Sequence, residues 1–484
     1  MAAIGTIEAH DWATGEFGHA VLGDERRTRR LIGIARGVLM RPGGTIGAVF
    51  DNLAELHGAY DFVENDAVPP AAIGAAMGVA TATRARAFAM VWIATDGSSV
   101  TVADRKRGKE TGRVGASTFA TRGDKIHSAL VLDPDGIPLG LCAQTQWQRG
   151  KAPTKVARNR LPTQDKETQR WLDVRATVRD LLIAHAPAVT RHFLHDREAD
   201  AWPLLLDAIA GEPGEYTTIR GQWDRRLVTD EATEDAPTRY LREALAASGI
   251  LGTYELAVSA GPKRTARTAV MEVRACRVTL DLKDKRTDQH HAAPVYAVCT
   301  REVSAVPKGD KAVEWLLLTT YPVTNLEAAR WVIAGYSKRW RIEQFHLAWK
   351  SAGTDVESTQ LEAADHRARW GLILAAVAVA LLRWQLLGRD QPTTPAATEF
   401  TPEQVEAVRD LQTRDEVPAQ GTVTVGQMVR AIAFLGGWTG AKARPPGTKI
   451  LVRGWGEVTA YLRGLKRRAK REEAAGNPDR SDVN

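Results

Sequence analysis

The stretch that decides the fold is FAMVWIAT, residues 88–95, which is followed by Asp96 and Gly97. A continuous apolar run of this length is typical of a strand buried on both faces in the sheet of an α/β protein. Because Asp-Gly favours a turn, we expect the strand to end there, with a carboxylate at its carboxyl end. A second run, residues 189–195, ends in the same way at Asp196. The sequence therefore predicts two buried strands, each of which presents an acid.

The segments around these two strands complete an α/β pattern. Residues 126–132 and 137–147 predict a hairpin, because they flank the turn sequence Asp133-Pro134-Asp135-Gly136. Amphipathic helices are expected over about residues 165–185 and from about Glu198, and residues 315–320 resume the strand pattern. Alternation of strands and helices is typical of an α/β core.

Five segments of different character follow one another along the chain. Residues 1–85 predict a helical domain, in which Asp24 caps a helix over 25–39 and a second helix buries Leu53, Leu56, Tyr60 and Val63. A β-rich insertion, 222–312, divides the core into a first part, 86–221, and a second part, 313–390. The Pro/Thr-rich stretch 392–402 suggests a linker. Residues 391–484 then predict a C-terminal helical domain with a basic tail.

Composition narrows the choice of partners. The 484 residues carry a net charge of +7, which favours a polyanion such as nucleic acid or an anionic membrane surface. The longest apolar run, residues 370–382, is shorter than the about 20 residues of a spanning helix, so it predicts a core helix and no membrane partner. Widely spaced cysteines and an N-terminus without an apolar signal stretch predict a reducing cytoplasm. Inside a cell, the favoured polyanions are DNA and RNA.

The helix expected over about residues 326–350 carries an ordered polar row. Tyr336, Arg339, Glu343 and Lys350 fall within about 60° of one another on a helical wheel. Ile342, Phe345 and Trp349 form a separate stripe, which we expect to pack on the core. The polar row is also consistent with a solvated charged face, so both interpretations stay open at this point.

Three acids now stand out: Asp96, Asp196 and Glu343. Carboxylates that converge in this way hold two Mg²⁺ or Mn²⁺ ions about 3.5–4 Å apart, because hard cations prefer oxygen ligands. Such ions activate a water or a 3′-hydroxyl for attack on a phosphodiester. Neighbouring cations would then hold the substrate phosphates. Taken singly, however, a strand-end aspartate is also a common turn former or helix cap.

The spacing of the polar row resembles the YREK signature of bacterial DDE transposases of the insertion-sequence-four class. Residues 196–200 resemble the second-aspartate motif of that family, residues 340–350 its glutamate helix, and residues 22–28 its N-terminal DNA-binding helix. The resemblance implies a multidomain α/β fold whose ribonuclease-H-like core is interrupted by the β insertion. It also implies that Asp96, Asp196 and Glu343 are the catalytic residues and the metal ligands.

The same resemblance implies contacts with double-stranded DNA. Trp315 would stack on a base flipped out of the transposon end, although it is equally consistent with a core aromatic. The arginines of residues 26–30 would contact DNA, or they form a solvated helix face. The implied phosphate contacts are Tyr336, Arg339 and Lys350 near the scissile bond, and Arg26, Arg27, Arg29 and Arg30 in the helical DNA-binding domain.

We therefore predict a homodimeric cut-and-paste transposase of the bacterial cytoplasm, associated with the nucleoid and dimerising through residues 391–484. It would cleave transposon ends by two-metal hydrolysis and transesterification, pass through a hairpin intermediate and join the 3′ ends to target DNA. Two alternatives stay open: a non-catalytic or domesticated DNA-binding relative, and a structure-specific nuclease on the same core. The sequence fixes no role for the loop Arg105–Arg113 or for His346.

Overall fold

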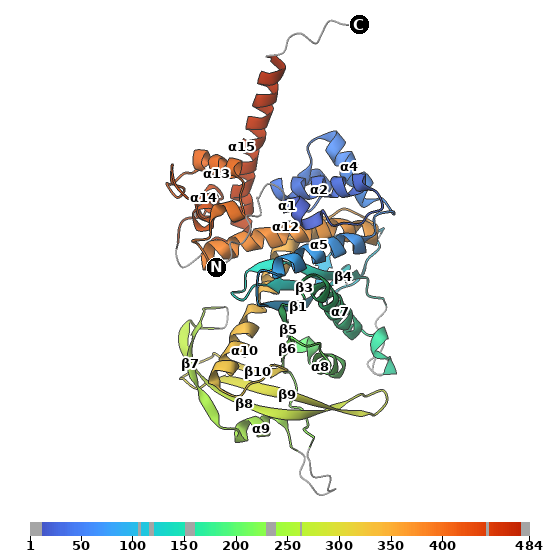
Figure 1. Cartoon of the computed structure of the whole chain (residues 1–484), viewed down its shortest axis with the longest axis vertical. Coiled ribbons are helices and arrows are strands. Elements are labelled where there is room, and N and C mark those ends of the chain that lie inside the picture. Colours follow the sequence, from blue (N-terminus) through green and yellow to red (C-terminus); the bar gives the residue numbers. More distant parts are fainter. Residues whose placement is uncertain are drawn as a thin grey trace.

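A computed structural model of the chain describes residues 12–104, 108–115, 121–150, 160–228, 239–261, 264–441 and 445–475. These ranges form a mixed α/β fold around one ten-stranded sheet, in the order β2-β3-β1-β5-β6-β10-β9-β8-β7, with β4 paired to β3 (Figure 1). The predicted α/β class is confirmed. The strands are β1 (Met90–Thr101), β2 (Gly112–Arg113), β3 (Arg122–Leu132), β4 (Pro138–Trp147), β5 (Thr190–His195), β6 (Glu215–Arg220), β7 (Ile250–Val258), β8 (Arg267–Lys283), β9 (His290–Glu302) and β10 (Glu314–Thr319).

β1 and β5, the two strands predicted to carry acids, lie side by side and run parallel. Asp196 directly follows β5, as predicted. β1, in contrast, does not end at Asp96. It continues to Thr101, because β3 pairs with it antiparallel well beyond the acid and places Ser128 opposite Asp96. Asp96 therefore lies inside a strand, at the point where that strand extends beyond its parallel neighbour.

The hairpin of β3 and β4 is confirmed. Its turn is held by the Asp133 carboxylate, which accepts hydrogen bonds from the backbone N–H groups of Asp135 and Ile137 at 2.9 and 2.8 Å. Gly136 has a φ of +91°, a conformation that side chains with a Cβ rarely adopt. The turn residues visible in the sequence thus fix this edge of the sheet.

The β-rich segment continues the core sheet, since β9 pairs with β10 and β10 pairs with β6. It also contains a short helix, α9 (Leu241–Ala247). In Figure 1 it occupies the end of the molecule opposite the C-terminal helices. Helices α7 (Thr168–His185) and α8 (Trp202–Ile209) connect β4, β5 and β6 in chain order.

The N-terminal segment is helical, as predicted. Asp24 caps α2 by accepting from the N–H of Arg26 at 2.8 Å. The predicted buried face of the second helix is partly confirmed: Val63 is buried and Leu56 and Tyr60 are half-buried against the core, whereas Leu53 is 71% exposed and Phe62 is buried in addition. The reason is that only the later turns of this helix reach the core. The helices are α1 (Trp12–Phe17), α2 (Glu25–Met40), α3 (Ile46–Val49), α4 (Leu53–Val63) and α5 (Pro70–Ala85).

The long apolar helix α12 (Ala364–Asp390) crosses the molecule between the N-terminal and C-terminal helices (Figure 1). Within the described ranges it is the one helix long and apolar enough to span a membrane, and 83% of its most apolar window is buried inside the fold. This agrees with the predicted core helix. The C-terminal helices are α13 (Pro402–Leu411), α14 (Val425–Leu435) and α15 (Thr448–Ala475).

The segment before α13 is not the extended linker that its composition suggests. Ala396 begins a short 3-10 turn, η6 (Ala396–Thr398), and Phe400 is buried. The Phe400 ring lies 4.8 Å from the Trp384 ring of α12. Packing of these apolar side chains onto α12 outweighs the flexibility expected from a Pro/Thr-rich stretch.

Candidate functional site

The register of β1 and β5 brings the two aspartates together. The ladder between the strands ends with Ala94 opposite Leu194, so the next residue pair is Thr95 with His195 and the following pair is Asp96 with Asp196. The pKa of Asp96 is raised to about 7, by burial first, then by the charges of Asp196 and Glu343, while the nearby Arg339 lowers it. The three carboxylates therefore share one electrostatic environment.

The predicted continuous helix over residues 326–350 is broken in the structure. It forms α10 (Leu326–Lys338), α11 (Arg341–Leu347) and a π-helical turn, η4 (Ala348–Ala352). At the break the backbone tightens, because the N–H of Arg339 bonds to the carbonyl of Tyr336 and that of Ile342 to the carbonyl of Arg339. Arg339 consequently turns inward, whereas Trp340 turns out to solvent with 58% exposure. The single-wheel arrangement of the polar row does not hold across this break.

The Arg339 guanidinium lies between two of the acids. Its Nη2 donates to Glu343 Oε1 at 2.6 Å, and its Nη1 is 3.7 Å from Asp96 Oδ2. Nη1 is buried and makes no hydrogen bond to any described residue. A buried guanidinium N–H without a partner is costly, so this atom is suited to receive an anionic oxygen.

Tyr336 and Lys350 occupy different surroundings. Tyr336 is 5% exposed, and its ring lies 5.8 Å from the Arg339 guanidinium. Lys350 lies in η4, where its Nζ is 3.6 Å from Glu357 Oε1. The structure therefore places Arg339 beside Glu343 and Tyr336 beside Arg339, whereas Lys350 pairs with Glu357, an acid outside the predicted set. The core stripe of Ile342, Phe345 and Trp349 is confirmed as buried.

The donor set suits hard cations, since it consists of carboxylates without thiolate or imidazole. Within the described ranges, no group of three or more His, Cys, Asp or Glu side chains is already arranged to hold a metal ion. The ion pair between Arg339 and Glu343 gives a physical reason, because it directs one carboxylate toward a guanidinium. Burial, and then the charges of Asp196 and Glu343, raise the pKa of Asp96, and a divalent cation near that carboxylate would stabilise its charged form. The residues thus fit a metal once Glu343 is released.

The Nε2 atom of His346 lies 3.4 Å from the hydroxyl of Ser128, the residue of β3 that is paired with Asp96. Burial, with smaller contributions from Lys350 and Arg339, lowers the pKa of His346 to about 3. The ring is therefore neutral at physiological pH. Of the loop Arg105–Arg113, residues 105–107 lie outside the described residues.

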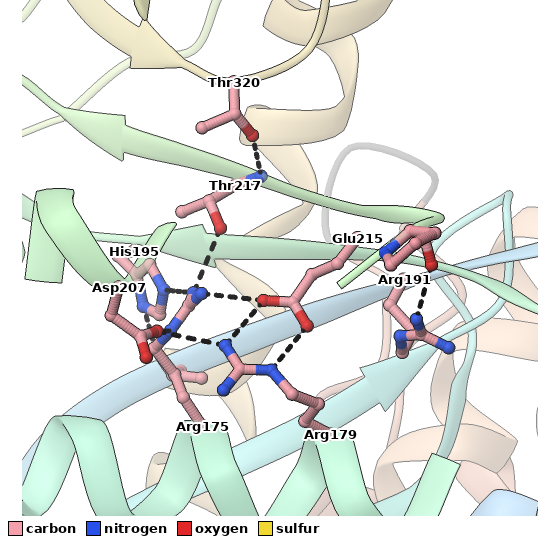
Figure 2. Close-up of polar contacts among 10 residues, drawn as sticks. Arg175, Arg179, Arg191, His195, Asp207, Glu215, Thr217 and Thr320 are labelled. Atoms are coloured by element: carbon pink, nitrogen blue, oxygen red, sulfur yellow. Dashed lines mark hydrogen bonds and ion pairs between the residues drawn. The ribbon is translucent and has the colours of Figure 1, made fainter. Parts of the chain in front are cut away.

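A buried polar network, which sequence reasoning missed, lies between α7, β5 and β6 (Figure 2). Arg175, on α7, reaches the ring of His195 and the acids Asp207 and Glu215. The second arginine of α7, Arg179, donates to the same two acids. No local signal in the sequence marks this cluster, because its members are spread over forty residues and meet only when the strands pair.

A basic groove of about 720 Å³ lies between α2 and α15. It is lined by cations from both ends of the chain and by one acid, Glu55. Arg463 and Lys466 of α15 face the α2 side of the groove, although more than four hundred residues separate them from α2 in sequence. The lining cations are Arg26, Arg29, Arg30, Arg36, Arg41, Arg463 and Lys466.

The four arginines singled out from the sequence are not equivalent. Arg26, Arg29 and Arg30 are exposed and line the groove. Arg26 also pairs with its neighbour Asp24 at 2.9 Å. Arg27 is half-buried and donates from Nη1 to the carbonyl of Leu22 at 2.8 Å, so it braces the entry to α2.

Trp315, on β10, lines a small pocket of about 160 Å³ between the β-rich segment and α10. Its ring meets the Tyr336 ring edge-on at 5.4 Å, and the Arg220 guanidinium lies 5.6 Å from it. Tyr254 and Arg330 also line the pocket. An aromatic ring beside a half-open pocket and next to Tyr336 fits both interpretations given to Trp315.

Comparison with known families gives a match over residues 9–68 to the family described as transposase DNA-binding. The matched range includes α2 and its arginines, which form one wall of the basic groove. The match supports a transposase, a class of enzyme that cleaves DNA and transfers strands, and it supports DNA as a partner.

Proposed function

We propose that this protein is a cut-and-paste DNA transposase of the DDE type, related to the insertion-sequence-four class, with a ribonuclease-H-like core. The observation that carries the proposal is the convergence of Asp96, Asp196 and Glu343 at one edge of the sheet, where Asp96 has a raised pKa. The transposase DNA-binding match and the basic groove add support from a separate part of the chain.

Asp96, Asp196 and Glu343 would hold two Mg²⁺ or Mn²⁺ ions. When bound, such ions supply a nucleophile at neutral pH and stabilise the leaving oxygen of a phosphodiester. The protein must first free Glu343 from Arg339, because one carboxylate oxygen cannot serve both partners fully. An incoming DNA phosphate offers Arg339 a replacement anion.

Arg339 and Tyr336 would then bind the phosphate beside the scissile bond. Nη1 of Arg339 already points toward Asp96 without a hydrogen-bond partner among the described residues. Lys350 would join them by exchanging Glu357 for a phosphate oxygen. These exchanges would couple DNA binding to assembly of the carboxylate site. The metal site would then be completed only when DNA is bound.

The proposed reaction sequence begins with a nick at each transposon end, in which water attacks phosphorus and a 3′-hydroxyl leaves. That hydroxyl attacks a phosphorus of the opposite strand and displaces the 3′-oxygen of the flanking DNA, which leaves a hairpin on the transposon end. A second water then attacks the hairpin phosphodiester and frees the 3′-hydroxyl again. The freed 3′-hydroxyls finally attack target DNA, and each attack displaces one 3′-oxygen of the target. Trp315 would stack the base that the hairpin forces out of the duplex.

The ends would be recognised by the helical domain of residues 1–85 through the groove between α2 and α15. Residues 86–221 and 313–390 would form the catalytic core, interrupted by the β-rich residues 222–312. Residues 391–484 would form the dimerisation domain of a synaptic complex. Light scattering of a chain truncated near residue 390 tests the last point, since a truncated chain that stayed dimeric would contradict it.

Cleavage of DNA that carries the native sequences flanking the gene tests the activity. Glu343→Gln keeps the shape of the side chain and removes its charge, so we expect it to abolish cleavage in Mg²⁺ while leaving DNA binding intact. Glu327→Gln, at an exposed acid on α10, serves as the matched control. Cleavage by Glu343→Gln at the wild-type rate would contradict the proposal. Cut ends without joined products would favour a structure-specific nuclease.

A further inference from the structure

The two sides of the β1–β5 pair carry different groups. Phe193 and His195 point to the face covered by α7, where Phe193 belongs to the same apolar cluster as Ile93. Leu194 belongs to the cluster on the opposite face, which contains α11 and α12. Because side chains alternate along a strand, Asp96 and Asp196 share the face of Leu194, and Thr95 and His195 lie behind them.

Thr95 and His195 form the last link between the two strands before the acids. The backbone ladder ends one pair earlier, at Ala94 and Leu194. The hydroxyl of Thr95 and Nδ1 of His195 are hydrogen-bonded, and both residues are fully buried. This side-chain bond therefore stands where a further backbone bond would otherwise be expected.

Arg175 fixes the tautomer of His195. Its Nη1 lies 2.9 Å from Nε2 of the ring (Figure 2). A guanidinium only donates hydrogen bonds, so Nε2 must accept. A neutral imidazole carries its proton on the other nitrogen, and Nδ1–H therefore donates to Thr95 Oγ1. The direction of both hydrogen bonds follows from the arginine alone.

Arg175 is itself held rigidly. It donates to Asp207 at 2.7 Å, to Glu215 at 2.9 Å and to the hydroxyl of Thr217 at 3.1 Å. Its guanidinium also stacks over the Phe193 ring at 4.3 Å. Since the residue is fully buried, each of these contacts has a large penalty if broken. Arg175 therefore holds the ring of His195 in one position through its hydrogen bond to Nε2.

We propose that His195 is a positioning residue that sets the separation of Asp96 and Asp196 by linking Thr95 to the anchored Arg175. The inference rests on the proposed function, because it concerns the carboxylates assigned there to metal. A metal pair tolerates only small displacements of its ligands, and supporting hydrogen bonds commonly contribute ten- to a hundredfold in metal affinity. Loosening the link should therefore weaken metal binding while leaving DNA binding unchanged.

Matched substitutions at Thr95 test the link in the full-length protein. Thr95→Val keeps the shape and removes the hydroxyl, whereas Thr95→Ser keeps the hydroxyl. Thr217→Val is the control, since it removes another bond to Arg175 without touching the link. We measure Mn²⁺ binding by the electron paramagnetic resonance of free Mn²⁺, together with the affinity for end DNA in EDTA.

We expect Thr95→Val to raise the dissociation constant for Mn²⁺ about tenfold, and Thr95→Ser and Thr217→Val to stay within about twofold of wild type. DNA affinity should not change in any variant. Wild-type Mn²⁺ affinity in Thr95→Val would overturn the proposal, as would an equal loss in Thr217→Val. The latter result would indicate general destabilisation in place of a specific link.

A second measurement is independent of metal. Nitrogen-15 spectra of histidine-labelled protein at pH 8 report which ring nitrogen carries the proton, and His195→Asn identifies the signal. We expect the Nδ1–H tautomer, and an Nε2–H tautomer would overturn the proposed link. Wild-type protein that bound no Mn²⁺ but showed the Nδ1–H tautomer would instead contradict the proposed metal chemistry, so the two failures are distinguishable.

Discussion

Arg339 donates to Glu343 across a single helical break, with Nη2 at 2.6 Å from Oε1. The bond exists because α10 ends just before Arg339 and α11 begins just after Trp340, which turns the guanidinium inward. An acid that could serve a metal is thus paired with a cation that could serve a phosphate. The pairing balances the charges of both groups until a substrate separates them.

Removing the Arg339 cation should raise the affinity for metal and lower the rate of DNA cleavage. In Arg339→Gln the competitor for Glu343 is lost, so we expect Mn²⁺ to bind several-fold more tightly without DNA. Cleavage should fall by about a hundredfold, because the phosphate loses a charged partner. Mn²⁺ titration and single-turnover cleavage measure the two effects. Arg341→Gln is the control, since that side chain bonds instead to Asp390. Weaker Mn²⁺ binding in Arg339→Gln would contradict this interpretation.

Stability in EDTA should decrease as pH rises, because the pKa of Asp96 is raised from 3.8 to about 7 in the folded protein. Between these values the folded state binds more protons than the unfolded state, so unfolding free energy is lost until pH passes about 7. At about 1.4 kcal/mol per pH unit, the loss is up to about 4 kcal/mol.

Asp96→Asn removes this dependence, so it should be no more stable than wild type near pH 4 and more stable at pH 8. Urea unfolding at the two pH values measures the difference. The control is Asp61→Asn, at an exposed carboxyl on α4. In the wild type, Mn²⁺ should raise the melting temperature more at pH 8 than at pH 5.5. An equal dependence of the unfolding free energy on pH in wild type and Asp96→Asn would show that the pKa of Asp96 is not raised.

The α15 wall of the groove should contribute to DNA binding. The double variant Arg463→Ala/Lys466→Ala removes two lining cations. If both contact phosphates, the slope of log K against log salt should fall by about 2. Fluorescence anisotropy at several salt concentrations measures it. Arg409→Ala/Arg414→Ala removes the same charge outside the groove, and equal slopes for the two double variants would exclude a specific contact.

Two substitutions at Trp315 distinguish a role in base stacking from a role in the core. A stacking role predicts that Trp315→Phe retains most hairpin formation, whereas Trp315→Ala loses it, since base–aromatic stacking contributes about 1–3 kcal/mol. The fluorescence of 2-aminopurine at the flipped position reports unstacking directly. Trp223→Ala, at an exposed ring, is the control. A role in the core alone predicts lower melting temperatures for Trp315→Ala without any change in that fluorescence.

Local signals predicted much of this fold. The Asp24 cap, the turn of β3 and β4 and the buried runs of β1, β5 and α12 are all encoded by neighbouring residues. The end of β1 was not predictable, because Asp-Gly favours a turn and only pairing with β3 carries the strand through it.

In the candidate site too, some features follow from neighbouring residues and others only from tertiary contacts. Asp196 follows from a strand end and Glu343 from helix spacing, whereas Asp96 lies inside β1, and no proline marks the break at Arg339. The break brings the Arg339 guanidinium to 3.7 Å from Asp96 Oδ2, a contact between residues far apart in the sequence. The link between Thr95 and His195 is equally invisible in the sequence, since it joins residues one hundred positions apart.

Side chains of α12 and α15 hold the N-terminal helices in place. Arg369 donates to the carbonyls of Val63 and Val68, Trp370 donates to that of Gly44, and Trp455 of α15 donates to that of Leu39. The segment that contains α2 is therefore held against α12 and α15 by hydrogen bonds from buried side chains. If the proposed function holds, this rigid attachment keeps the DNA-binding groove at a constant distance from the carboxylate site. The number of base pairs between the recognised sequence and the cut bond would then be fixed by the protein, and an inserted base pair would block cutting instead of shifting it.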